Sequence, residues 1–123
     1  MKKISILIYL FLAFLSIKIF PQTFFGNEPL AHTYSIVARD PQTGEMGVAV
    51  QSHWFSVGSI VAWGEAGVGV VATQSFVNPS FGQRGLELLK TGKTAQEVVD
   101  ELIASDEGRD VRQLAIVDSK GNS

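Results

Sequence analysis

The sequence contains no cysteine and only two histidines. The absence of cysteine excludes a disulfide scaffold, a thiolate zinc site and a cysteine nucleophile. His32 and His53 lie far apart in the sequence, and neither has a carboxylate beside it at the spacing of metal ligands. We therefore expect no metal site, and the sequence indicates no cofactor.

Positive charge is also sparse. Beyond residue 31 the chain carries seven basic and eleven acidic residues, and no cluster of Lys and Arg is present. A nucleic-acid-binding domain normally presents a basic face to the phosphates. We therefore expect no nucleic-acid partner.

One long apolar run stands at the beginning of the chain. Lys2 and Lys3 precede the apolar segment Ile4–Ile17, and Lys18 ends it. A membrane-spanning helix needs about 20 apolar residues, whereas a short apolar run behind a positive start is typical of a secretory signal peptide. The pattern predicts an exported protein, periplasmic or extracellular, without a stable membrane anchor.

The cleavage point stays open between two positions, after Gln22 and after Ala31. Residues 1–22 are taken as the signal peptide and residues 23–32 as a linker. The remaining segment, residues 33–123, is long enough for one small domain.

Four apolar segments predict two β-hairpins, and a fifth strand follows later in the chain. The two segments of the first hairpin are apolar at nearly every position, which predicts strands covered on both faces. The second hairpin turns at Gly64-Glu65-Ala66-Gly67, where glycine permits a positive φ. The predicted strands are 33–40, 46–52, 59–63, 68–73 and 111–117.

Two helices are predicted between the fourth and fifth strands. Asn78 and Pro79 provide a start for the first helix, and Gly92 provides its end. Thr94 and Glu97 form a capping box that begins the second helix. Antiparallel strands followed by helices indicate the α+β class. The turn residues 118–122 predict a sixth strand, so we expect the N-terminal half of a larger domain.

Three motifs carry a resemblance to a known family. The segments Thr33-Tyr-Ser-Ile-Val-Ala-Arg-Asp, Gly47-Val-Ala-Val-Gln-Ser-His-Trp-Phe and Thr73-Gln-Ser-Phe-Val-Asn-Pro-Ser-Phe-Gly resemble the DUF1028 family. The resemblance covers residue 33 to the end. It implies an Ntn-hydrolase fold, an αββα sandwich of two antiparallel sheets between helical layers, but it implies no settled reaction.

The same resemblance implies a nucleophile. In Ntn hydrolases the first residue of the first strand attacks the substrate, and its own α-amine is the base. Thr33 holds that position here, but only removal of His32 would free its amine. With the amine blocked, Thr33 is an ordinary strand hydroxyl. Ser35 lies on the same face of the strand and is a second candidate.

Other polar residues gather where strands end. His53 is a candidate general acid or base, and it is equally well explained as a solvent-facing or structural histidine. The residues before the first helix can stabilise an oxyanion at its N-terminus, or can simply cap the helix and form a turn. The candidate substrate-binding residues are Gln51, Ser52, Trp54, Gln74, Ser75 and Asn78.

These observations predict an exported amide-bond hydrolase whose substrate the sequence does not identify. The alternative is a catalytically silent module that binds a small molecule or a glycan near His53 and Trp54. In both cases the expected ligand is a small or peptide-like molecule. Because Ntn hydrolases often assemble, a homodimer is also expected.

Overall fold

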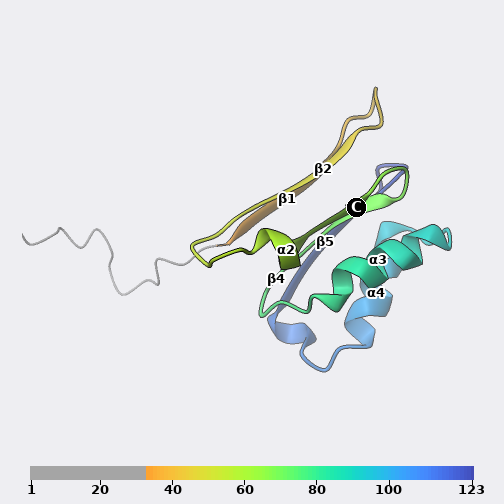
Figure 1. Cartoon of the computed structure of the whole chain (residues 1–123). Coiled ribbons are helices and arrows are strands. Elements are labelled where there is room, and N and C mark those ends of the chain that lie inside the picture. Colours follow the sequence, from red (N-terminus) through yellow and green to blue (C-terminus); the bar gives the residue numbers. More distant parts are fainter. Residues whose placement is uncertain (1–32) are drawn as a thin grey trace, which may run out of the picture. The chain divides into compact units, whose positions relative to one another are not determined.

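A computed structural model describes residues 33–123, which form five strands in two antiparallel sheets and three α-helices (Figure 1). The α+β class predicted from the sequence is confirmed. The predicted signal peptide and linker lie outside the described residues. Between residues 33 and 123, no helix has the length and apolar character needed to cross a membrane.

The first sheet is a hairpin of β1 (Tyr34–Arg39) and β2 (Met46–Gln51). Its bounds agree with the first two predicted strands. The Asp40 carboxylate accepts two backbone N–H bonds inside the turn, and Gly44 takes a φ of 77° that a side chain would disfavour. The turn therefore follows from local chemistry.

Burial alternates along this hairpin. Residues of one face are half-buried, whereas Ile36 on the other face keeps 63% of its surface exposed. The apolar runs had predicted strands covered on both faces. Within the described part of the chain, β1 and β2 are covered on one face only.

The second sheet has the order β3-β4-β5, with β3 (Ala62–Glu65), β4 (Gly69–Ser75) and β5 (Arg112–Asp118). The β3–β4 turn is closed by a bond from Val68 N to Glu65 O of 3.1 Å, and Gly67 takes a φ of 75°. A short 3₁₀ turn, η1 (Arg109–Val111), leads into β5. The predicted second hairpin and fifth strand are confirmed, with shifted bounds.

The predicted strand 59–63 is wrong in its first half, because residues Gly58–Val61 form the short helix α2. The Ser59 hydroxyl donates to Ser56 O at 2.9 Å, and Val61 N donates to Val57 O at 2.9 Å. These local bonds offer the backbone an alternative to strand pairing, and they override the β propensity of the apolar residues.

The two longer helices begin and end as predicted. In the capping box of α4 (Ala95–Ala104), Thr94 Oγ1 accepts from Glu97 N at 3.3 Å and the Glu97 carboxylate accepts from Thr94 N at 2.7 Å. Helix α3 (Ser80–Lys90) is followed by Gly92, whose φ of 90° is typical of a helix stop.

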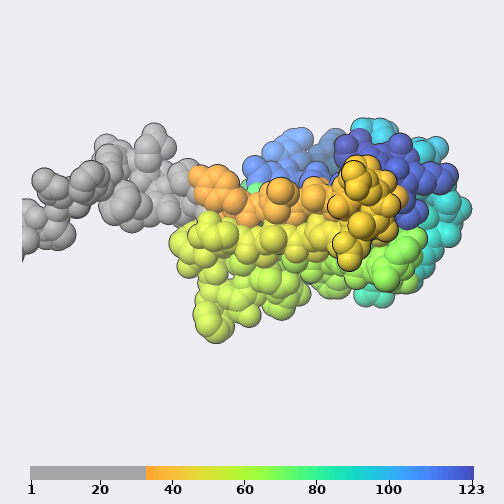
Figure 2. All heavy atoms as spheres, turned by 90° about the horizontal axis from the view of Figure 1, so that it is seen from above, coloured from red at the N-terminus to blue at the C-terminus, as the bar shows by residue number. Residues whose placement is uncertain are grey.

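The described elements form three layers. Helices α3 and α4 cover one face of the β3-β4-β5 sheet, and the β1–β2 hairpin covers the other (Figure 1). Figure 2 looks onto the hairpin, orange to yellow, with the other elements behind it. The apolar core lies between helices and sheet and contains Val71, Phe81, Leu86, Leu89, Ala95, Val98, Leu102 and Ile116.

A buried carboxylate joins the end of β5 to the start of α4. Asp118 is 6% exposed and accepts hydrogen bonds from Asn122 N, Asn122 Nδ2 and Lys120 N, and from the backbone of Ala95. Burial acts to raise the pKa of Asp118, but the hydrogen bonds together outweigh it and the pKa is lowered. The ionised carboxylate thus stabilises the fold.

Asp118→Asn is expected to lower the free energy of unfolding at pH 7 by about 1 to 3 kcal/mol, because the buried side chain loses its charge and one of the two oxygens that accept from its neighbours. A carboxylate whose pKa is lowered on folding stabilises the protein above its unfolded pKa of about 3.8. That contribution disappears as the pH falls through the folded pKa. Urea unfolding between pH 7 and pH 3 should show the difference shrinking. Asp110→Asn, at an exposed position, is the control; equal effects would contradict this role.

Candidate functional site

Three strand ends bring together residues that are distant in the sequence. Thr33 immediately precedes β1, Ser52 follows β2, and Gln74 lies near the end of β4. Thr33 Oγ1 and Ser52 Oγ are 2.9 Å apart, and Gln74 Nε2 donates to Thr33 O at 3.2 Å. The structure thus brings two other predicted site residues, Ser52 and Gln74, to Thr33, and all three are half-buried.

The Ser52 hydroxyl is held in place from two sides. It accepts a hydrogen bond from Trp54 N at 3.1 Å in addition to its contact with Thr33 Oγ1. A hydroxyl has one donor and two acceptor sites. Ser52 Oγ therefore still has a site for Thr33 Oγ1, as donor or as acceptor, while the loop holds its oxygen in place.

The amide of Gln74 also joins two strands of the second sheet. Gln74 and Gln113 are opposite each other in the β4–β5 register, and Gln74 Nε2 donates to Gln113 Oε1 at 2.8 Å. Gln74 Oε1 is buried and has no hydrogen-bond partner among the described residues. Sequence reasoning missed Gln113, because only the pairing of β5 with β4 places it beside Gln74.

A cavity of about 280 Å³ opens at this amide pair. It lies between the inner face of β1 and the strands β4 and β5. The second predicted hydroxyl, Ser35, reaches this cavity because it shares a strand face with Thr33. The lining residues are Ser35, Ala72, Gln74, Gln113, Leu114 and Ala115.

The residues around the end of β2 are exposed. The rings of His53 and Trp54 contact each other with centroids 4.9 Å apart and an interplanar angle of 54°. Trp54 is 68% exposed and Phe55 is 98% exposed. Gln51 alternates with Ser52 along the strand, so its side chain lies on the exposed outer face of β2, away from Thr33.

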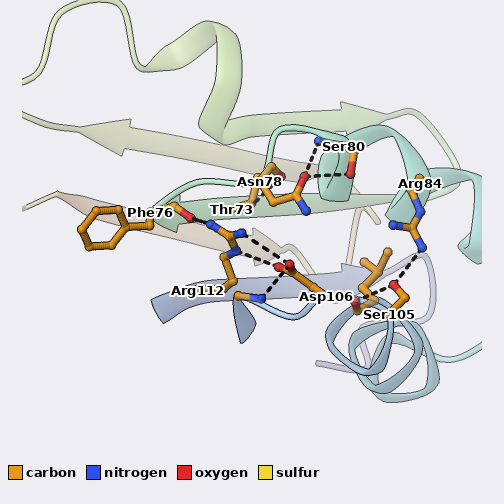
Figure 3. A network of polar contacts seen from close by, with 10 residues as sticks. Thr73, Phe76, Asn78, Ser80, Arg84, Ser105, Asp106 and Arg112 are labelled. Atoms are coloured by element: carbon orange, nitrogen blue, oxygen red, sulfur yellow. Dashed lines mark hydrogen bonds and ion pairs between the residues drawn. The ribbon is translucent and has the colours of Figure 1, made fainter. Parts of the chain in front are cut away.

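Asn78 has structural partners at the start of α3. Its Oδ1 accepts from Ser80 N at 3.2 Å and from Ser80 Oγ at 2.8 Å, as Figure 3 shows. Its side chain also hydrogen-bonds to Asp106. Asn78 therefore caps the helix, which was one of the two interpretations. Ser75, at the end of β4, is exposed and takes a φ of 69°, a left-handed conformation that is costly for a residue with a side chain.

An ion pair fixes the segment that leaves β4. Arg112 Nε lies 2.7 Å from Asp106 Oδ2, and the Arg112 guanidinium also donates to Phe76 O (Figure 3). The hydrogen bond from Arg112 lowers the pKa of Asp106 against the effect of burial, with a further bond from Gly108 N. The pKa of Arg112 is raised by the same partner. This network ties the segment that follows β4 to the start of β5.

The donor set around Thr33 consists of hydroxyl and amide groups. In the part of the chain that the structure describes, no three His, Asp or Glu side chains come close enough together to hold a metal ion.

Comparisons with known proteins give a family and a similar solved structure for this chain. Residues 33–123 match the family described as "Family of unknown function (DUF1028)". A crystal structure of protein SPO2555 from Silicibacter pomeroyi, assigned to DUF1028, is similar with a TM-score of 0.69 and 35% sequence identity. The match covers 73% of this chain and 40% of that protein. No curated protein matches the chain.

Proposed function

The chain belongs to the DUF1028 family, and we propose that it is an exported Ntn-type hydrolase that cleaves an amide bond with Thr33. The Ntn class and the role of Thr33 are what the family resemblance implies, export is what the apolar run at the start of the sequence predicts, and the geometry at Thr33 supports the assignment. The observation that carries this proposal is the position of Thr33 Oγ1, 2.9 Å from Ser52 Oγ at the end of the two facing sheets. A hydroxyl that is half-buried and held by a second hydroxyl is a suitable nucleophile once a base is supplied.

The layer order supports the same proposal. Helices, a three-stranded sheet and a two-stranded sheet correspond to three of the four layers of an αββα sandwich. Thr33 precedes the first strand of the inner layers, which is the position of the nucleophile in the Ntn class. The outer face of β1 and β2 carries apolar side chains such as Ile36 that a fourth layer would bury.

The proposed reaction begins with a free α-amine at Thr33. An α-amine has a pKa near 8 and takes the proton of Oγ1 close to neutral pH. Oγ1 then forms a bond to the amide carbonyl carbon. The C–N bond breaks, the leaving amine receives the proton, and an ester on Thr33 remains. Water hydrolyses this ester, which releases the acid and restores the hydroxyl.

The neighbouring side chains have distinct roles in this scheme. Ser52 orients Oγ1, and Gln74 fixes the carbonyl of Thr33 and thereby its backbone. Both are positioning residues. The half-buried location limits water around the oxygen, which strengthens these hydrogen bonds.

The test compares two forms of the exported protein. We expect the form that begins at Thr33 to hydrolyse members of a panel of small amides and peptides, and the form that retains His32 to be inactive. Mass spectrometry measures both the N-terminus and the products. A natural mature form with any residue before Thr33, or equal activity of both forms, would refute this mechanism.

A second function is supported by the exposed rings beside the site. His53, Trp54 and Phe55 present aromatic surface at the end of β2, and exposed aromatic surface next to a site often marks ligand binding. A silent binding module would be stabilised against heat by small molecules or glycans without turnover. Thr33→Ala would leave that stabilisation unchanged, whereas Trp54→Ala would remove it.

A further inference from the structure

We infer that the cavity beside Thr33 binds a neutral carboxamide or peptide group of the ligand, held by Gln74 and Gln113. This inference rests on the proposed function and narrows it to a substrate class. The substrate would carry a second amide group close to the amide bond that is cleaved, as a peptide or an amidated amino acid does.

Gln74 carries an unsatisfied acceptor. Gln74 Nε2 makes two hydrogen bonds, to Thr33 O and to Gln113 Oε1, which fixes the orientation of its amide. Gln74 Oε1 is then left buried without a partner among the described residues. A buried acceptor without a donor is destabilising, because it has lost its hydrogen bond to water. A ligand that donates an N–H would remove this cost.

Gln113 supplies a donor beside that acceptor. Gln113 Oε1 is occupied by Gln74, whereas no hydrogen bond of Gln113 Nε2 is found within residues 33–123. The two glutamines are register partners on adjacent strands. Both residues line the same cavity, and between them they hold one buried acceptor and one donor without a hydrogen bond among the described residues. An amide group presents the complementary pair, an N–H and a C=O.

The lining of the cavity carries no charge. All six residues that line the cavity are neutral, and its volume of about 280 Å³ suits one side-chain-sized group. A carboxylate ligand would meet the unpaired oxygen of Gln74, and an ammonium ligand would meet no counter-charge there. The chemistry of the lining therefore favours a neutral polar group.

The position of the cavity links it to the proposed reaction. Ser35 lines the cavity and is two residues from Thr33 on the same strand face. Two residues along a strand correspond to roughly 7 Å, about the distance between one peptide group and the next but one. A substrate held by its second amide in the cavity would thus place a nearby amide bond at Thr33 Oγ1.

The test measures binding without turnover, on exported protein that carries Thr33→Ala. The probes are propionamide, which carries one neutral carboxamide, and propionate, which carries a carboxylate in its place. Chemical-shift changes in NMR titrations give the two dissociation constants. We expect the neutral probe to bind at least tenfold more tightly, with the largest changes at the side-chain amides of Gln74 and Gln113.

Gln113→Glu removes the outward donor but keeps an oxygen that accepts from Gln74. We expect it to weaken binding of propionamide at least tenfold. Gln42→Glu makes the same change of charge in the exposed turn of the β1–β2 hairpin and should leave binding unchanged. Equal affinity for both probes, equal loss in both variants, or no saturable binding, which would mean that only water occupies the cavity, would overturn the inference.

The two proposals fail in distinguishable ways. If binding follows these expectations but the form beginning at Thr33 has no amidase activity, the cavity is a ligand site of a non-hydrolytic protein. If turnover depends on Thr33 while Gln113→Glu has no effect on binding or on KM, the hydrolase proposal stands and the substrate class is wrong.

Discussion

Gly82→Ala is expected to lower the free energy of unfolding by about 3 kcal/mol or more, at the upper end of overpacking effects. A Cβ at Gly82 would lie 2.2 Å from Cγ of the Trp63 ring and 2.3 Å from its Cδ1. Trp63 has little freedom to move away, because its Nε1 donates to Ile60 O at 3.0 Å. Either helix α3 must shift from the sheet or the ring must leave its place.

Gly85→Ala is the matched control for this prediction. Gly85 lies in the same helix and is buried, but its nearest neighbour would be Val71 Cγ2 at 3.2 Å, which a small side-chain adjustment accommodates. Alanine also favours the helix over glycine by about 1 kcal/mol. Thermal unfolding should show a fall in Tm of roughly 10 to 20 °C for Gly82→Ala and only a few degrees for Gly85→Ala. Similar shifts would show that the ring contact is unimportant.

Features of the fold that depend on neighbouring residues can be predicted from the sequence, whereas contacts between distant segments cannot. The capping box of Thr94 and Glu97 and the helix stop at Gly92 depend on bonds within a few residues, so they could be predicted. The contact between Gly82 and Trp63 depends on how closely α3 packs onto β3. No local pattern contains that distance.

The first strand of the second hairpin was predicted too long, because residues Gly58–Val61 form a helix. Ile60 and Val61 have strong β propensity, yet the bonds from the Ser56–Ser59 segment wind them into α2. Two local tendencies compete there, and hydrogen bonding decides between them. Propensity alone could not predict the result.

The residues of the candidate site also fall into those that the local sequence pattern predicts and those that only the structure places. The alternation of a strand was sufficient to place Thr33 and Ser35 on one face, and the end of the second strand pointed to Ser52. Gln113 could not be found, because its position beside Gln74 depends on the register of two strands that are distant in the sequence. Asn78 could be assigned to capping only when its partners were known.

In protein that begins at residue 33, Thr33→Ala is expected to lower kcat for amide hydrolysis by roughly 10³-fold or more, the range found when a nucleophile is removed. Alanine keeps the free α-amine, the backbone and the carbonyl that Gln74 holds. It removes only the oxygen that would bond to the substrate. Thr33→Ser restores a hydroxyl and should therefore retain activity within about tenfold of the unsubstituted protein.

Steady-state kinetics on the best amide of the panel decide the matter, with circular dichroism as a check of folding. Thr43→Ala is the control, because it removes an exposed threonine hydroxyl in the turn of the β1–β2 hairpin and should leave kcat unchanged. Turnover that survives Thr33→Ala would mean that another group attacks the amide. The contact between Thr33 and Ser52 would then serve only to join β1 to the end of β2, and the aromatic surface at Trp54 would become the site to investigate.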